Sequence, residues 1–231
     1  MVRFLELARL QSATAVAAIV LAGCSSNGKD TVLSAVLNEV VPGEETGQAS
    51  NPAENITRAQ INRLGVALIR VHETKTADQN LLVAFRQSGP QVTYVLRSDR
   101  RLVMHGGLIQ STYGFGHNLA PIGVRDQDPI AFPRPVKHWP AFILRDYEVS
   151  DRGAGEPTTV SCGFSFGPIG VLDIVERDVV VQTVRETCSG KGIEFTNRYD
   201  VDPSSGAIWR SKQWTGAAQG PLTYEVLEPL D

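Results

Sequence analysis

Short runs of β-branched and apolar residues, separated by turn residues, constrain the fold of this chain more than any other feature. Gly, Pro, Asp, Asn or Ser occupy many of the gaps between the runs. Gaps this short favour antiparallel neighbours, because a parallel crossover needs a dozen or more residues. The sequence therefore predicts an all-β fold, an antiparallel barrel-like domain or a sandwich. We expect strands at residues 66–71, 81–86, 91–96, 101–104, 141–149, 158–166, 170–175, 179–187, 193–201, 207–214 and 222–227.

Helical signals are confined to the N-terminal part of the chain. Thr57 and Gln60 have the spacing of a capping box, which predicts a helix of one or two turns ending before Gly65. Residues 31–40 carry apolar side chains at helical spacing after Asp30, a candidate N-cap. We expect a short helix there, with an early strand as the alternative because valine is frequent in this stretch.

Two stretches lack apolar periodicity. Residues 42–55 are rich in Gly, Pro, Glu, Ser and Gln, which is typical of a linker or mobile loop. Residues 106–118 hold glycines among aromatic residues, and prolines recur through residues 121–140. We expect this Pro/Gly-rich middle segment to be irregular and to pack over one face or one end of the sheet.

The N-terminus has the organisation of a secretory signal. Arg3 and Arg9 come before a short apolar run at residues 13–21. The run is too short to cross a bilayer, which takes about 20 apolar residues. Residues 21–24, Leu-Ala-Gly-Cys, resemble the lipobox of bacterial lipoproteins, which implies that Cys24 receives a diacylglycerol and palmitate-type acylation and is held at a membrane surface. The alternative is an ordinary signal peptide followed by an incidental cysteine.

These signals divide the chain into three parts. Residues 1–23 form the predicted signal peptide, and residues 24–56 contain the lipidated cysteine, a tether, the short helix and the linker. Residues 57–231 form the β domain. The length that remains after cleavage suits one domain with a core of its own.

The other two cysteines, Cys162 and Cys188, are predicted to form a disulfide. An even pair in an oxidising compartment is most simply a bridge. Zinc is the alternative, but it needs four ligands, and the chain has neither a Cys-x-x-Cys motif nor closely spaced histidines. We expect no metal and no cofactor.

The charge pattern argues against nucleic acid as a partner. The formal net charge is −3, and the densest basic cluster, Arg97, Arg100 and Arg101, is interrupted by Asp99. Proteins that bind nucleic acid rely on clustered Lys and Arg residues.

Residues 163–167 match the G-x-S-x-G pattern of a nucleophile elbow around Ser165. That chemistry needs a strand-to-helix turn and triad partners later in the chain, whereas another β run follows and all four histidines come earlier. His105 and His117 could approach each other if the glycine-rich segment folds as a hairpin, but their spacing is not that of a metal site. We therefore predict no catalytic residue.

Aromatic residues are the best candidates for a binding surface. Tyr and Trp combine an apolar face with a polar group, which suits sugar rings or a protein interface. Alternatively, they fill the barrel or its mouth. Trp209 and Trp214 lie five positions apart, so on a regular strand they point to opposite faces unless a bulge intervenes. The candidates are Tyr113, Phe115, Trp139, Trp209 and Trp214.

Two passages carry a family resemblance. The first contains Arg-Leu-Val-Met-His-Gly-Gly at residues 101–107 and Thr-Tyr-Gly-Phe-Gly at 112–116; the second contains Asn-Arg-Tyr-Asp-Val-Asp at 197–202 and Ile-Trp-Arg-Ser-Lys-Gln-Trp at 208–214. With the lipobox, their order resembles that of the YjbF family, or group 4 capsule polysaccharide lipoproteins. The chain departs from the family pattern at Arg100, where a glycine is usual, and at His105, where a threonine is usual.

The resemblance implies a non-enzymatic accessory of exopolysaccharide or capsule production and export. It implies a periplasm-facing domain anchored to outer-membrane lipid through Cys24, which acts by binding proteins of the export machinery or nascent glycan. Ser25 fits outer-membrane sorting. The resemblance carries over no catalytic residue. One alternative is a periplasmic polysaccharide-modifying hydrolase that uses Ser165 or a carboxylate pair, and another is a structural envelope lipoprotein.

Overall fold

The computed structural model describes residues 52–96, 99–148 and 157–230. The predicted signal peptide at 1–23, the predicted lipid attachment at Cys24 and the predicted helix at 31–40 lie outside the described residues, as does most of the predicted linker. No helix in the described part of the chain is long and apolar enough to cross a membrane.

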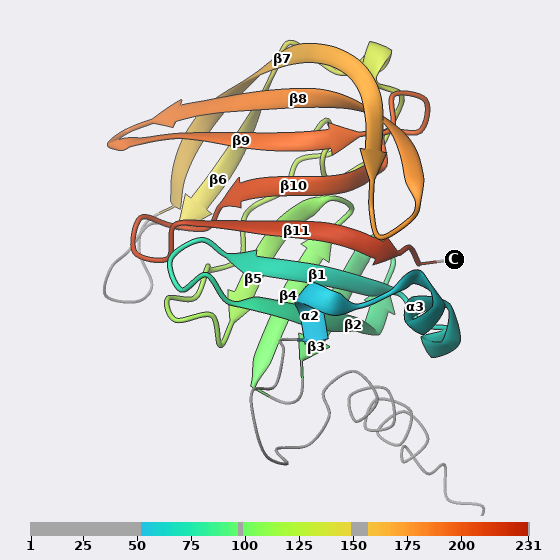
Figure 1. Ribbon diagram of the computed structural model, residues 1–231. Coiled ribbons are helices and arrows are strands. Elements are labelled where there is room, and N and C mark those ends of the chain that lie inside the picture. Colours follow the sequence, from blue (N-terminus) through green and yellow to red (C-terminus); the bar gives the residue numbers. More distant parts are fainter. Residues whose placement is uncertain (1–51, 97–98, 149–156, 231) are drawn as a thin grey trace, which may run out of the picture.

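Eleven strands form one antiparallel sheet in the order β5-β4-β3-β2-β1-β11-β10-β9-β8-β7-β6 (Figure 1). The first and last strands of the described residues, β1 and β11, therefore pair in the middle of the sheet. The predicted all-β fold is confirmed. The strands are β1 Leu68–Glu73, β2 Gln79–Ser88, β3 Gln91–Leu96, β4 Arg100–His105, β5 Leu108–Tyr113, β6 Phe142–Glu148, β7 Pro157–Asp173, β8 Asp178–Gly190, β9 Ile193–Val201, β10 Ile208–Trp214 and β11 Pro221–Glu228.

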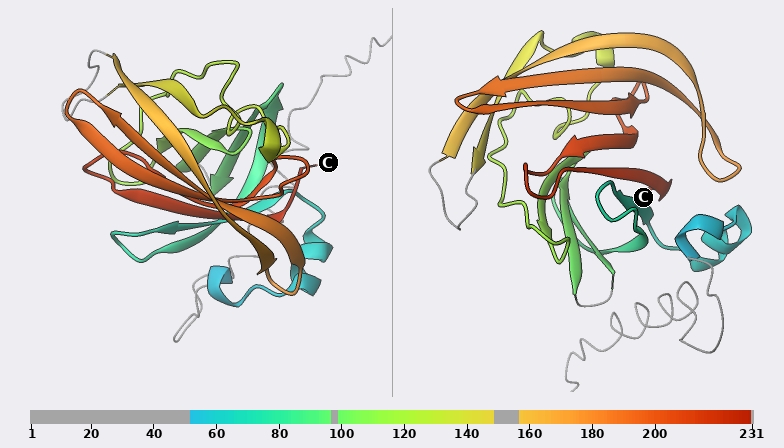
Figure 2. Two further views of the ribbon diagram at one scale, coloured as in Figure 1. Left: turned by 90° about the horizontal axis from the view of Figure 1, so that it is seen from above. Right: turned by 60° about the vertical axis from the view of Figure 1, so that its left-hand side comes forward.

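The sheet is strongly curled, and part of the middle segment bridges its two edge strands, β5 and β6 (Figure 2). On the β5 side, the Ile122 amide donates to the Gln110 carbonyl at 2.9 Å. On the β6 side, the Gly123 amide donates to the Asp146 carbonyl, also at 2.9 Å. The segment thus connects both edges and makes the sheet barrel-like, rather than only covering a face or an end.

Two strand predictions are corrected. β5 lies in the segment that we expected to be irregular, because Gly106 and Gly107 form only the turn between β4 and β5. The runs at 158–166 and 170–175 are a single strand, β7, with a register shift between Phe166 and Ile169. In this bulge Gly167 and Pro168 lie opposite the single residue Thr183. A Gly-Pro pair is typical of a turn, which is why the sequence predicted two strands.

Helix α3, Arg58–Leu64, begins as predicted. Thr57 and Gln60 form a complete capping box, and Gly65 ends the helix in the left-handed conformation with φ of 60°. Helix α2, Pro52–Asn55, is one turn at the end of the stretch that we expected to be a linker. A single 3-10 turn, η1 at Val136–His138, lies before β6.

Apolar side chains pack on both faces of the sheet. The larger cluster lies inside the curl and takes residues from the strands and the middle segment. The smaller cluster lies on the outside, where Ile61 of α3 packs with residues of β1, β2 and β11 and with the tip of the β7–β8 hairpin. Leu82 belongs to the inner cluster and its neighbours Leu81 and Val83 to the outer one, as strand alternation requires.

A disulfide joins Cys162 of β7 to Cys188 of β8. The two cysteines are directly opposite each other across the strand pair, and both are fully buried in the inner cluster. The bridge therefore ties the two longest strands together inside the core.

Candidate functional site

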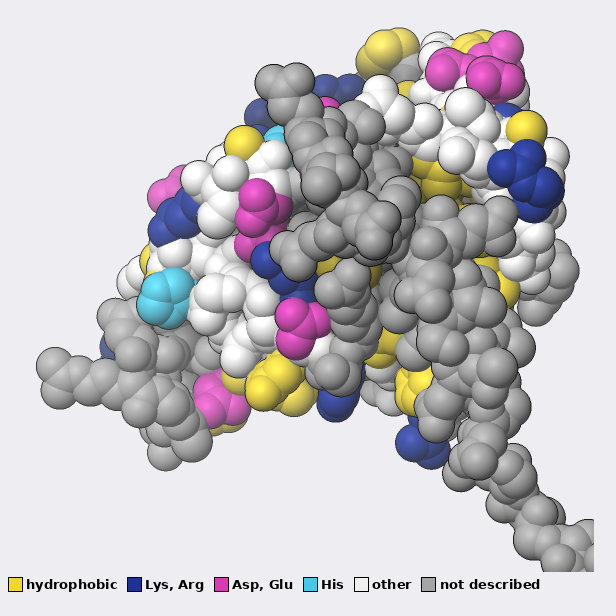
Figure 3. All heavy atoms as spheres, turned by 60° about the horizontal axis from the view of Figure 1, so that its bottom comes forward, with side chains coloured by type: hydrophobic (Ala, Val, Ile, Leu, Met, Phe, Trp, Pro, Cys, Tyr) yellow, Lys and Arg dark blue, Asp and Glu magenta, His cyan; other side chains and the backbone are white. Residues whose placement is uncertain are grey.

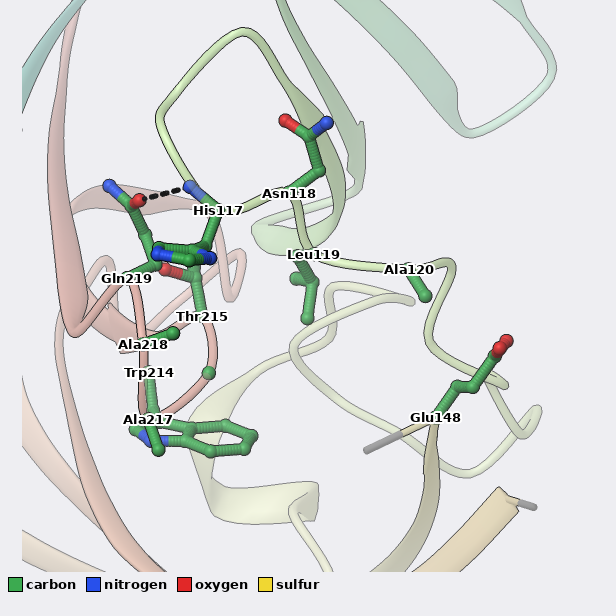
Figure 4. A pocket seen from close by; sticks show the side chains of 11 residues that line it. His117, Asn118, Leu119, Ala120, Glu148, Trp214, Thr215, Ala217, Ala218 and Gln219 are labelled. Carbon is green, nitrogen blue, oxygen red and sulfur yellow. Dashed lines mark hydrogen bonds between the residues drawn. The ribbon is translucent and has the colours of Figure 1, made fainter. Parts of the chain in front are cut away.

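Two loops at one end of the barrel line a pocket of about 520 Å³ (Figure 4). Residues 117–120 follow β5, Trp214 ends β10, and residues 215–219 belong to the loop between β10 and β11. Glu148, the last residue of β6, stands across the pocket from His117. The volume lies within the range of about 300–1,000 Å³ that is typical of small-molecule sites.

Among the described residues that line this pocket, Trp214 is the only Trp, Tyr or Phe. Its indole stacks on the ring of Phe195, with centroids 4.5 Å apart and an angle of 8° between the planes. Tyr147 packs edge-on against the same indole at 5.5 Å. The Trp214 backbone amide also donates to Asn197 Oδ1 at 2.7 Å. The indole is thus held in place before any ligand arrives.

Hydrogen bonds hold the two loops together. Gln219 Oε1 accepts from the backbone amide of His117 at 3.0 Å, which joins one wall of the pocket to the other. Thr215 Oγ1 donates to the Gly220 carbonyl at 2.7 Å. Lys75 Nζ donates to the Ala218 carbonyl from outside the pocket. These contacts indicate a largely preformed site.

The pocket carries little charge. Glu148 is the one acidic residue among the described lining residues, and none of them is Lys or Arg. On the face drawn in Figure 3, acidic and basic side chains of the described residues are interspersed, without a continuous patch of either sign. The lining of the pocket suits an uncharged ligand better than a polyanion.

A buried ion network lies inside the barrel, beside the disulfide. Arg145 donates two hydrogen bonds to Asp128, at 2.6 and 3.0 Å, and one to Glu186 at 2.9 Å. Glu186 Oε2 also accepts from Asn197 Nδ2 and from Tyr199 Oη, each at 2.8 Å. The two carboxylates outweigh the effect of burial and raise the pKa of Arg145 well above its ordinary value.

This network is a structural feature rather than a candidate active site. Arg145, Asp128 and Glu186 are fully buried, so a substrate has no access to them. Among the described residues, Cys162, Glu186 and Cys188 lie close enough together to suggest a metal cluster. The two sulfurs are joined in the disulfide and so are not available as thiolate ligands.

The predicted aromatic surface does not exist as one surface. Phe115 and Trp139 are 1% and 9% exposed, so both belong to the core. Trp139 satisfies its indole N–H internally, at 2.9 Å from the Arg134 carbonyl. Tyr113 is exposed beside the Arg101 guanidinium, away from the residues that line the pocket.

Trp209 and Trp214 pack against opposite faces of the sheet, as their spacing predicts. Trp209 packs on the outer cluster and Trp214 on the inner one. A register shift between Ile208 and Arg210 places a bulge at Trp209, and both tryptophans are half-buried. Of the five aromatic candidates, Trp214 alone lines the pocket.

Ser165 does not lie on a nucleophile elbow. It sits in the interior of β7, exposed, and its hydroxyl points to the Arg185 carbonyl at 3.5 Å on the neighbouring strand. His105 is packed edge-on against Phe132 at 4.7 Å, and burial lowers its pKa. His117 instead lines the pocket.

Sequence reasoning missed His117 and Gln219 as pocket residues. Both lie in glycine-containing loops, and loops that are far apart in sequence meet only after the sheet has formed. The signal that could have found them is the position of each loop beside an aromatic residue, Phe115 before His117 and Trp214 before Gln219.

Comparisons with known proteins agree with this architecture. The profile of a family described as group 4 capsule polysaccharide lipoprotein GfcB, YjbF, matches residues 28–227. The uncharacterized lipoprotein GfcB of Escherichia coli K12 is 27% identical over 144 residues, which are 60% of this chain. The matched part spans 65% of that relative's length.

A solved structure has a similar fold. The crystal structure of the hypothetical lipoprotein YmcC from Escherichia coli K12 superposes with a TM-score of 0.66 at 21% identity. The match covers 81% of this chain and 100% of the other. At this identity the likeness concerns the fold alone.

Proposed function

Because the chain belongs to the YjbF family of group 4 capsule polysaccharide lipoproteins, we propose that it is a non-enzymatic accessory of exopolysaccharide or capsule production and export. The observation that carries this proposal is the family match, which runs from residue 28 to residue 227. The protein acts by binding, either to a protein of the export machinery or to nascent glycan.

The proposed location is the outer membrane, with the domain facing the periplasm. Residues 1–23 are removed, Cys24 is acylated, and the chain up to residue 56 links the lipid to the β domain. The leader and lipobox in the sequence support this arrangement, and the relatives are lipoproteins. Metabolic labelling with palmitate tests it: the wild type should be labelled in the outer-membrane fraction, and Cys24→Ala should not.

The site geometry favours binding over hydrolysis. A glycoside hydrolase needs two carboxyl groups about 5–9.5 Å apart on either side of the bond that it cleaves. The described lining of the pocket supplies only Glu148. Ser165 lies within a strand, without the turn that an esterase nucleophile requires. No contact among the described residues supports the hydrolase alternative.

Deletion of the gene tests the proposed role. We expect the amount of surface polysaccharide to fall, and the wild-type gene to restore it. Cys24→Ala, which keeps the whole domain but lacks the lipid site, should restore it poorly. Unchanged surface polysaccharide in the deletion strain would contradict the proposal and favour a structural envelope role.

A further inference from the structure

The pocket between the loops after β5 and after β10 has the composition of a sugar-binding site. Sugar rings present C–H groups on their faces and hydroxyl groups around their edge. A site for them therefore combines a flat aromatic surface with polar groups at its margin. Trp214 provides the surface, and Phe195 and Tyr147 fix its orientation. No induced rearrangement of the aromatic ring is needed.

At the margin of the pocket, the exposed His117 side chain is a polar group that makes no hydrogen bond with the described residues. Only the His117 backbone amide is engaged, with Gln219. The imidazole can therefore bind a hydroxyl group without breaking a bond that holds the loop. Figure 4 shows this ring on the same side of the pocket as Thr215 and Gln219, above the indole.

The charge of the lining narrows the class of sugar. A uronic acid or a phosphorylated sugar would meet the Glu148 carboxylate and no described Lys or Arg in the lining. Burying an unpaired anion beside a carboxylate is unfavourable. A neutral sugar has no such cost. The rim residues Gly116, His117 and Asn118 are exposed, so a residue of a longer chain can enter from solvent.

We propose that this pocket binds one neutral sugar residue of a polysaccharide chain, with a C–H face on Trp214 and hydroxyl groups near His117. The inference rests on the proposed function, because it selects glycan over protein as the ligand of this site. It assigns Trp214 and His117 to ligand contact. Phe195 and Tyr147 position the indole and do not touch the sugar.

The test uses the mature lipidated protein in detergent micelles. Cellotetraose, maltotetraose and tetra-N-acetylchitotetraose serve as neutral probes, and tetragalacturonate serves as the acidic probe. Polysaccharide purified from the cells that make the protein is the fifth. Binding is measured by calorimetry and by saturation-transfer NMR, which also reports which sugar protons lie against the protein.

The variants are Trp214→Leu and His117→Ala, with Trp209→Leu as the matched control. Trp209 belongs to the same strand and packs on the opposite face, so its loss removes a similar side chain without touching the pocket. We expect Trp214→Leu to weaken binding of a neutral probe or of the purified polysaccharide by about tenfold or more. His117→Ala should weaken it several-fold, and Trp209→Leu by less than about twofold. Because His117 is exposed, its variant remains informative if Trp214→Leu fails to fold.

The outcomes separate this inference from the proposed function. If the wild type binds none of the neutral probes and not the polysaccharide, the inference is overturned, although the deletion phenotype can still support an accessory role through a protein partner. Binding that survives both pocket substitutions places the glycan elsewhere and overturns it too. Preference for tetragalacturonate overturns the choice of a neutral sugar. Binding lost in the pocket variants, with normal polysaccharide in the deletion strain, supports the site and refutes the role.

Discussion

Two polar regions of this barrel, the buried ion network and the pocket, differ in whether their polar side chains are paired within the protein. In the buried network, Arg145 is bound by Asp128 and Glu186, and Glu186 is bound by two more side chains. In the pocket, the His117 imidazole faces solvent without a described partner. Asn197 connects the regions, because it donates to Glu186 and accepts from the Trp214 amide.

The two regions should therefore contribute differently to the free energy of folding and to ligand binding. A buried charge that loses its partner cannot recover water, so substitutions in the network should cost folding free energy. The His117 side chain at the pocket is exposed and still hydrated, so its substitution should leave the fold intact and alter binding. The network holds the Trp214 backbone in place through Asn197, and the Trp214 side chain lines the pocket.

The largest expected effect is at Arg145. Arg145→Met leaves Asp128 and Glu186 buried without their cation and should lower the free energy of unfolding by about 3–5 kcal/mol. Urea denaturation followed by circular dichroism measures this. Arg101→Met, at an exposed arginine beside Tyr113, is the control and should cost less than about 1 kcal/mol. Equal losses in both variants would contradict the comparison.

The disulfide should contribute somewhat less. Cys162 and Cys188 are 26 residues apart, and a closed loop of this size stabilises a fold by about 3 kcal/mol. The double variant Cys162→Ala/Cys188→Ala should therefore unfold at a lower urea concentration. Reducing agent should shift the wild type by a similar amount and leave the double variant unchanged. If reducing agent leaves the urea midpoint of the wild type unchanged, the result contradicts the disulfide.

High pH should also lower the free energy of unfolding, but gradually as the pH rises. Burial raises the pKa values of Tyr94 and Tyr147 to about 12. The unfolded chain releases these protons near pH 10, so their contribution is complete below pH 10 and is lost as the pH rises. Between pH 10 and 12, each tyrosine should reduce stability by about 1.4 kcal/mol per pH unit. Urea titrations at pH 9, 10 and 11 measure the slope. A flat profile would show that these phenols are hydrated.

The smallest effect on stability is expected in the pocket. Glu148→Gln removes the one acidic side chain of the described lining and should change the free energy of unfolding by less than about 1 kcal/mol. The same variant should discriminate less against tetragalacturonate than the wild type does. A large loss of stability with unchanged selectivity would show that Glu148 belongs to the structural region.

Local signals were the predictable part of this fold. The capping box at Thr57 depends on residues three positions apart, and most strands were found because alternation and turns are written into neighbouring residues. The disulfide was predicted because Cys162 and Cys188 are the two cysteines that remain beside Cys24. β5 was missed because glycines flank it, although they serve the turns on either side of the strand. A Cβ on Gly106 would clash with the Ala131 carbonyl oxygen, and one on Gly114 with the Asp99 carbonyl oxygen.

The closure of the barrel and the pocket could not be predicted in the same way. Ile122 and Gly123 join strands β5 and β6 through backbone hydrogen bonds, which leave no pattern in side chains. Gln219 meets His117 across 102 positions of sequence. Of the predicted aromatic residues, Trp214 lines the pocket and Phe115 is buried in the core, because composition identifies aromatic residues but not which of them the core takes up.

The pairing of β1 with β11 has a consequence for how the molecule is made. Strand β1 has β2 as one neighbour, but its other neighbour is β11, at the far end of the described residues. Arg58 likewise donates to the Leu227 carbonyl, 169 positions away, and this bond cannot form before β11 has been made. Long-range pairing of this kind makes folding slow. A chain that ends before β11 therefore leaves β1 with an open, apolar edge, and its sheet cannot be completed.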